Sequence, residues 1–331
     1  MKIAPLFFFL LTSFFIAQAQ ETPFQSSTKW NIPSGNERWD YLKVEHNRLY
    51  VSHTDRVHIL DAITSKVLGE IGQLKGVHGI APVSFVGKGY ITNGATNEIT
   101  VFDLKSFQVL KTVAIPGKKA DAILFDPFSK RVFVFNNGSG NAEVIDPKTD
   151  EVIGQVEMGG APEFSVSDLK GSIFNNNEDS HEIIEIDAKS LKIKNRFSLA
   201  PNEVPTGLAI DLKNNRLFSV CRKTKTLVVM DAQTGKIVST LPIGAGVDGV
   251  VFDPKMKLII ASNADGTATV VKQNSKDSYS VIQTIQTSKG LRTIAIDEKT
   301  NRIFLPGATF TEDGKSLVPE SFGVLVFQAG K

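Results

Sequence analysis

Seven positions, spaced roughly forty residues apart, carry side chains that can bind a charged ligand or transfer a proton. They mix carboxylates with an imidazole, a hydroxyl and a guanidinium: Asp40, His78, Asp121, Glu163, Thr206, Asp248 and Arg292. Ionisable groups are costly to crowd together without a partner, so their convergence would indicate a polar binding site. The alternative is a solvated funnel in which the same groups cap loops and order water.

A second series of positions follows shortly after the first, and asparagine is frequent in it. Its members are His53, Asn93, Asn136, Asn176, Cys221, Asn263 and Gly307. Turn geometry is an alternative explanation for the asparagines, because Asn tolerates left-handed backbone and hydrogen-bonds locally. From both series we take as candidate ligand-binding residues Asp40, His53, His78, Asn93, Asp121, Asn136, Glu163, Asp248, Asn263 and Arg292.

A divalent metal is a further candidate ligand. His53 and His78 fall in adjacent repeats, and Glu163 or Asp121 could complete a shell of nitrogen and oxygen ligands. The sequence has no local ligand motif such as His-x-x-x-His, so we assign no metal-binding residues and expect no cofactor. Cys221 is expected to be a partly buried neutral thiol.

Motifs of other catalytic chemistries are missing from the sequence. It has no Gly-x-Ser-x-Gly elbow, no glycine-rich phosphate loop leading into a helix and no Cys-x-x-Cys-His haem attachment. Catalytic residues are therefore left unassigned, and we expect a binding protein rather than an enzyme.

The elements that must position these residues are short strands in a repeat. An apolar strand ending in aspartate recurs at intervals of 42, 43, 41 and 44 residues, at Asp61, Asp103, Asp146, Asp187 and Asp231. Each unit holds four short strands, and weaker units near Lys272 and Gln328 bring the number to seven. Such units are typical of propeller blades. We predict an all-β protein with a single seven-bladed β-propeller, four antiparallel strands per blade and almost no helix.

The two ends of the propeller sequence are complementary. Residues 28–33 match a fourth strand, whereas the C-terminal end stops after a third strand at 322–327. We therefore predict that the N-terminal strand closes the last blade by pairing with this third strand. The last blade also has a long connection, residues 308–321, which is expected to flank the funnel as a functional loop.

The first nineteen residues have the features of an export signal. Lys2 precedes an apolar run from Leu6 to Ile16, and Ala17-Gln18-Ala19 supplies a cleavage pattern. The run is shorter than the roughly twenty residues of a membrane span, although an uncleaved anchor is the alternative. We predict a signal peptide over 1–19, a propeller over 20–331 and a soluble protein that is periplasmic or secreted.

The charge balance argues against nucleic acid as a partner. Lys and Arg number 37 against 35 Asp and Glu, a formal net charge of +2. Nucleic-acid binders normally concentrate an excess of basic residues on one face. We therefore do not expect nucleic acid as a partner, and expect a small molecule or another protein instead. The protein itself is expected to be a monomer without a membrane span.

One tetrapeptide carries a family resemblance. Tyr90-Ile91-Thr92-Asn93 resembles the sequence that names the YVTN β-propeller repeat family, and the fuller unit with Thr234-Gly235-Lys236 and Phe252-Asp253-Pro254 is similar to YncE-like exported proteins. The resemblance covers about residues 28–331 and implies the propeller fold and export. Proteins of similar architecture include surface-layer proteins, lactonases, lyases and propeller subunits of redox enzymes. The expected function is binding of a ligand or partner in the axial funnel. The alternatives are a metal-assisted lyase or lactonase using the same funnel, and nucleic-acid or polyanion binding.

Overall fold

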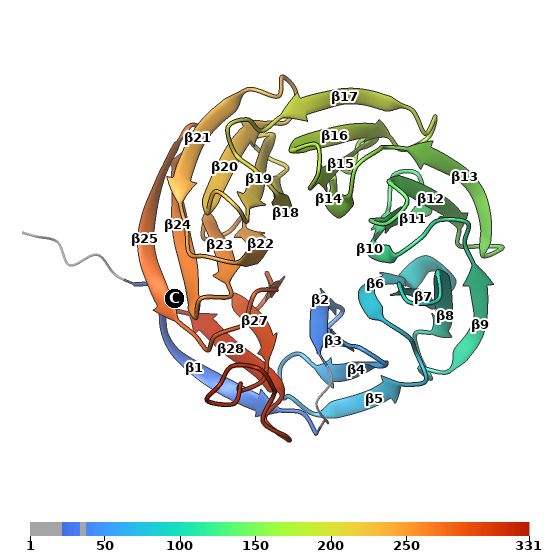
Figure 1. Cartoon of the computed structure of the whole chain (residues 1–331), viewed down its shortest axis with the longest axis horizontal. Coiled ribbons are helices and arrows are strands. Elements are labelled where there is room, and N and C mark those ends of the chain that lie inside the picture. The colour runs from blue at the N-terminus through green and yellow to red at the C-terminus, as the bar shows by residue number, and fades with distance from the viewer. Residues whose placement is uncertain (1–21, 34–37, 331) are drawn as a thin grey trace, which may run out of the picture.

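The computed structural model describes residues 22–33 and 38–330, which form seven four-stranded antiparallel sheets around one axis (Figure 1). In each blade the first strand lies next to the axis and the fourth lies at the rim. The predicted seven-bladed propeller is confirmed. The described residues contain one short helix, the 3-10 turn η1 (Ser84–Val86), and no helix that is long and apolar enough to cross a membrane. The predicted signal peptide, residues 1–19, lies outside the described residues.

The strands follow one another blade by blade. Blades 1 and 2 contain β2 (Trp39–Glu45), β3 (Arg48–His53), β4 (Arg56–Asp61), β5 (Val67–Ile71), β6 (Val77–Val83), β7 (Lys88–Asn93), β8 (Glu98–Asp103) and β9 (Val109–Ala114). Blades 3 and 4 contain β10 (Ala120–Asp126), β11 (Arg131–Asn136), β12 (Asn141–Asp146), β13 (Glu151–Glu157), β14 (Pro162–Ser167), β15 (Ser172–Asn177), β16 (Glu182–Asp187) and β17 (Ile193–Ser198). Blades 5 and 6 contain β18 (Pro205–Asp211), β19 (Arg216–Cys221), β20 (Thr226–Asp231), β21 (Ile237–Pro242), β22 (Val247–Asp253), β23 (Leu258–Asn263), β24 (Thr267–Ser275) and β25 (Ser278–Gln286). Blade 7 contains β26 (Ala295–Asp297), β27 (Arg302–Gly307), β28 (Gly323–Ala329) and β1 (Phe24–Asn31).

The aspartate that ends the third strand in the first five blades stabilises a turn. Asp61 Oδ1 accepts hydrogen bonds from the backbone N–H groups of Ile63 (3.0 Å) and Thr64 (2.7 Å). Asp103, Asp187 and Asp231 accept the equivalent pairs of hydrogen bonds in their blades. These bonds stabilise the tight connection to the fourth strand, as Asx turns do. The residue that marks the repeat in the sequence is thus a structural one.

Hydrophobic clusters between adjacent blades form the core. Tyr50 and Ile59 of blade 1 pack against Ile80, Ile91 and Phe102 of blade 2, and all five side chains are buried. Burying one such side chain contributes about 1.5–3 kcal/mol. Because each blade covers the apolar face of the next, the ring must be closed for every blade to be covered.

Ring closure uses the N-terminal strand, as predicted. β1 pairs antiparallel with β28, with Trp30 opposite Val324, and Ile32 N donates to Phe322 O at 3.1 Å. The Trp30 ring also packs on Phe304 of β27, with ring centroids 5.5 Å apart. Figure 1 shows the blue β1 beside the red β28. The last blade therefore joins both ends of the described chain in one sheet.

Glycines allow adjacent first strands to approach closely. A Cβ atom at Gly249 of β22 would lie 2.9 Å from the backbone nitrogen of Ile294, just before β26. A Cβ atom at Gly207 of β18 would lie 2.9 Å from the carbonyl oxygen of Asp248. These close approaches hold the first residues of neighbouring blades near one another around the axis.

Candidate functional site: the axial mouth

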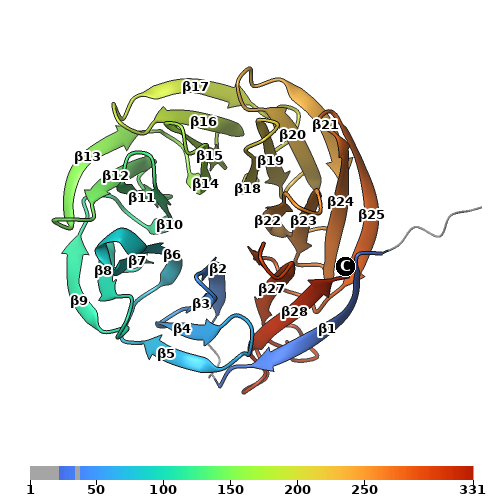
Figure 2. The ribbon, with the colours of Figure 1, turned by 180° about the vertical axis from the view of Figure 1, so that it is seen from behind.

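The first strands of the blades bring the first series of predicted residues to one end of the axis. Figure 2 shows the first strands around the axis; each begins at this face, so its earliest residues lie beside the opening. The polar groups that interact there come from all seven blades, and we call them the axial mouth: Asp40, Tyr41, His78, Asp121, Asn137, Glu163, Glu178, Arg222, Asp248 and Arg292. The predicted convergence of the first series therefore occurs for all its members except Thr206, whose buried hydroxyl bonds to backbone carbonyls.

One cluster joins three consecutive blades. His78 Nδ1 lies 2.5 Å from Asp40 Oδ2 and 3.6 Å from Asp121 Oδ1. One ligand atom from each of these residues lies within 4.8 Å of the others, the spacing of a group that can hold a metal ion. Burial alone would lower the pKa of His78, but the hydrogen bond to Asp40 and the charge of Asp121 raise it overall. Burial raises the pKa of Asp121 to about 7, with repulsion from Asp40 adding to the effect against the attraction of His78.

A second cluster crosses the axis. The Tyr41 hydroxyl of blade 1 donates to Glu163 Oε2 of blade 4 at 3.2 Å, and Asn137 Nδ2 donates to Glu163 Oε1 at 3.0 Å. The Tyr41 ring also packs on Phe164, with centroids 5.5 Å apart. Burial, followed by the charge of Asp121, raises the pKa of Glu163 well above its usual value. Tyr41 thus extends through the axis toward the opposite side of the ring.

A third cluster holds both arginines of the mouth. Asp248 accepts a hydrogen bond from Arg222 Nη1 at 3.1 Å and forms an ion pair with Arg292, whose Nε lies 3.1 Å from Asp248 Oδ2. Arg222 also binds Glu178 through a short ion pair. Burial raises the pKa of Asp248 to about 6, although the charge of Arg292 opposes this shift. Arg292 was predicted either to bind an anionic group or to pair with Asp248 or Asp40, and the structure pairs it with Asp248.

Acidic groups outnumber basic groups in the mouth, although burial raises the pKa of Asp121, Glu163 and Asp248. Five carboxylates (Asp40, Asp121, Glu163, Glu178 and Asp248) surround two guanidiniums, and each guanidinium is already paired with a carboxylate. Lys119 adds one further cation at the rim, where its ammonium donates to Asn137 Oδ1 at 2.7 Å. A cleft of one charge sign concentrates ligands of the opposite sign. The arrangement therefore favours a cationic group.

The second predicted series lies inside the blades. Asn93 donates to Thr100 Oγ1 at 2.8 Å, Asn136 donates to Asn141 Oδ1 at 3.1 Å, and Asn263 donates to Thr267 Oγ1 at 3.0 Å. In each case the buried amide joins the end of the second strand to the third strand of its own blade. These asparagines lie in strands rather than in left-handed turns, and their local hydrogen bonds join the second and third strands of one blade.

His53 and Cys221 are also placed away from the mouth clusters. The buried His53 ring stacks on Phe322 at 4.4 Å, and His53 does not belong to the metal-ligand group of Asp40, His78 and Asp121. His78 is therefore a member of that metal-ligand group, whereas His53, the other histidine suggested from the sequence, is not. Cys221 is buried, and burial raises the pKa of its thiol to about 12, as expected for a neutral thiol.

Four mouth residues were missed by the sequence analysis. Tyr41 directly follows Asp40, and Asn137, Glu178 and Arg222 each follow the end of a second strand. The signal was present, since each lies one or two residues after a position in one of the two series. The 308–321 connection lies on the same face, where Ala308, Leu317 and Phe310 pack in a cluster with Trp39. In Figure 1 this loop lies over blade 7 rather than across the axis.

The comparisons with known proteins return no match to any family model or to any curated protein. The YVTN and YncE-like resemblance therefore stays a prediction, and the function has to be argued from the mouth itself.

Proposed function

We propose that this protein is an exported binding module whose axial mouth binds a ligand with a positively charged group. The observation that carries the proposal is the convergence of Asp40, His78 and Asp121, whose ligand atoms lie within 4.8 Å of one another. Glu163 and Asp248 add two further carboxyl groups around the axis. Burial raises the pKa of both, and a bound cation would favour their ionised forms. The YVTN resemblance and the apolar N-terminal run support export.

Asp121 is the centre of the proposed site. Asp121 is only 7% exposed. Among the described residues its closest charged partner is His78, whose Nδ1 lies 3.6 Å from Asp121 Oδ1. A buried carboxylate without close donors is costly when ionised. A bound cation offsets the cost of burying the ionised Asp121 carboxylate. This relief contributes to the binding free energy of the cation.

An anionic ligand fits the mouth less well. Both arginines are engaged by Asp248 or Glu178, and an anion would have to displace these carboxylates. The same argument, together with a formal net charge of only +2, disfavours nucleic acid and other polyanions.

A metal-assisted enzyme is the second candidate, and a specific observation favours it. One imidazole and two carboxylates are a common donor set for divalent ions. Glu163, whose pKa is raised by burial, lies in the same mouth and is suited to protonate a leaving oxygen. Such a lactonase would hydrolyse δ-valerolactone only with added metal, and Glu163→Gln would abolish turnover while leaving Mn²⁺ binding intact. Absence of turnover in the metal-loaded protein would reject this candidate.

Isothermal titration with MnCl₂ and with methylguanidinium chloride tests the proposed function. Wild type should bind at least one of the two, and Asp121→Asn should weaken that binding at least about tenfold, the ratio that ~1.4 kcal/mol represents. Glu312→Gln, which removes an exposed carboxylate from the 308–321 loop, is the control and should bind as wild type does. The proposal is wrong if neither cation binds at millimolar concentration, or if Asp121→Asn binds as tightly as wild type.

A further inference from the structure

A large apolar cavity lies on the axis beyond the mouth. It has a volume of about 610 Å³ and is lined by the first strands of all seven blades. The lining residues come from the middle and the C-terminal ends of these strands, among them Ile80, Ile123, Val166, Ile210 and Ile296. Because the strands begin at the mouth, the cavity opens at the opposite face of the ring. Its size is that of a pocket for a small organic molecule.

Exposed apolar side chains lie in the turns that follow the first strands on one side of this opening. Leu169 and Leu212, which are 48% and 40% exposed, line the cavity from the turns after β14 and β18. Phe85 and Phe128 occupy the equivalent turns of blades 2 and 3 and are 48% and 41% exposed. Four consecutive blades thus carry a large apolar side chain in this turn, and of the four Leu169 and Leu212 line the cavity. Clustered exposed apolar groups mark surfaces that bind something.

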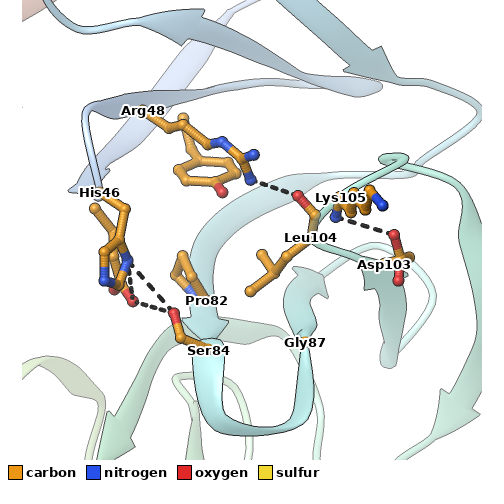
Figure 3. Close-up of a pocket in the computed structure, with 10 residues that line it drawn as sticks. His46, Arg48, Pro82, Ser84, Gly87, Asp103, Leu104 and Lys105 are labelled. Atoms are coloured by element: carbon orange, nitrogen blue, oxygen red, sulfur yellow. Dashed lines mark hydrogen bonds and ion pairs between the residues drawn. The ribbon is translucent and has the colours of Figure 1, made fainter.

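The other side of the opening is acidic. Glu298 of blade 7 and Glu45 of blade 1 both line the cavity, with Lys43 as the one lining cation among the described residues. Glu45 also borders a smaller neighbouring hollow of about 390 Å³ (Figure 3). There the Ser84 hydroxyl donates to Glu45 at 3.1 Å and His46 Nδ1 lies 3.5 Å from it. Within the lining of the larger cavity, two carboxylates therefore stand against one ammonium.

Tyr41 separates the cavity from the mouth. Its ring lines the inner end of the cavity and packs on Phe164, whereas its hydroxyl donates to Glu163 in the mouth. A ligand that enters from the opposite face therefore meets an aromatic floor. The mouth and the cavity are two sites on one axis, with different chemistry.

We propose that this cavity binds a cationic amphiphile, a small molecule whose apolar body lies between the first strands and whose positive group lies beside Glu45 and Glu298. The apolar walls favour the body because binding removes both surfaces from water. The acidic rim selects the charge of the head group. The site is independent of the proposed function of the mouth, because it uses other residues at the other end of the axis.

Isothermal titration with three decyl compounds below their micellar concentrations tests this proposal. Decyltrimethylammonium should bind at least about tenfold more tightly than decyl maltoside, and decanoate should bind most weakly. Glu298→Gln, at an exposed position, should reduce this preference severalfold and leave decyl maltoside binding unchanged. Ile296→Trp should weaken binding of all three, because the larger ring occupies the cavity. Glu312→Gln is the matched control and should behave as wild type.

Further measurements separate the cavity from other sites. Saturating Mn²⁺ should not displace decyltrimethylammonium, since the mouth lies at the other end of the axis. Thermal melting of each variant checks that it is folded. Equal affinity for the three decyl compounds, an unchanged preference in Glu298→Gln, or binding only to anionic lipid vesicles and not to the free amphiphile would each overturn the proposal.

Discussion

His78 of blade 2 and Asp40 of blade 1 are joined side chain to side chain, with Nδ1 of the imidazole 2.5 Å from Oδ2 of the carboxylate. The two residues are 38 positions apart in the chain, and Asp121 of blade 3 approaches the same nitrogen at 3.6 Å. A contact of this kind ties neighbouring first strands together at the axis. It also concentrates ionisable groups where a ligand can reach them, so the stability of the ring and the properties of the mouth depend on the same residues.

The raised pKa of Asp248 predicts a pH-dependent stability. Its folded-state value of about 6 exceeds the unfolded value of about 3.9, so the folded state keeps a proton that the unfolded state loses. The associated stability is present below pH 4 and is lost as the pH rises through 6. Asp248→Asn has no such titration. The difference in unfolding free energy between Asp248→Asn and wild type should therefore rise, in favour of the variant, by on the order of 2 kcal/mol between pH 4 and pH 7. Urea unfolding across this range measures it; parallel curves for the two proteins would contradict it.

Removing the closing strand should destabilise the whole ring. Deletion of residues 20–33 exposes the edge of β28 and removes the Trp30–Phe304 contact, so we expect a large fall in melting temperature. Trp30→Ala alone should cost about 2 kcal/mol, because the ring is only partly buried. Thr28→Ala, at an exposed position of the same strand, is the control and should change little. A deletion variant that melts within one or two degrees of wild type would show that closure is unimportant.

Neutralising Arg292 should strengthen cation binding in the mouth. Arg292 is paired with Asp248, and its side chain is 46% exposed, so Arg292→Ala should change the unfolding free energy by less than about 1 kcal/mol. Asp248 is then left with one cationic partner, and affinity for Mn²⁺ or methylguanidinium should rise severalfold. Lys289→Ala removes the same charge from an exposed position outside the mouth and serves as the control. Weaker cation binding in Arg292→Ala would mean that the arginine itself recognises the ligand.

Cys221 should be unreactive in the folded protein. Its thiol is buried and its pKa is raised to about 12, so almost no thiolate exists at neutral pH. Iodoacetamide at pH 8 should label the protein only after denaturation, as measured by intact-mass spectrometry. Rapid labelling under native conditions would show that β19 opens readily or that the thiol is activated.

The repeat made the fold predictable from the sequence alone. The Asp-ended third strands recur at nearly constant spacing because each aspartate caps the same turn, as the bonds of Asp61 to Ile63 and Thr64 illustrate. Closure was also predictable, since residues 28–33 have the pattern of a fourth strand that the last blade lacks. Local hydrogen-bonding chemistry and strand periodicity carry this information, and both are readable along the chain.

The pairing of the side chains was decided by the tertiary structure. The sequence placed Asp40, His78 and Asp121 at equivalent starts of first strands, but only the ring radius sets which of them touch. Tyr41 reaches Glu163 across the axis although 122 positions separate them. Asn93 and His53 occupy equally regular positions, yet the register of their strands directs them into the blades. Position along a repeat fixes the blade and the face, whereas contacts between blades depend on how closely the first strands pack around the axis.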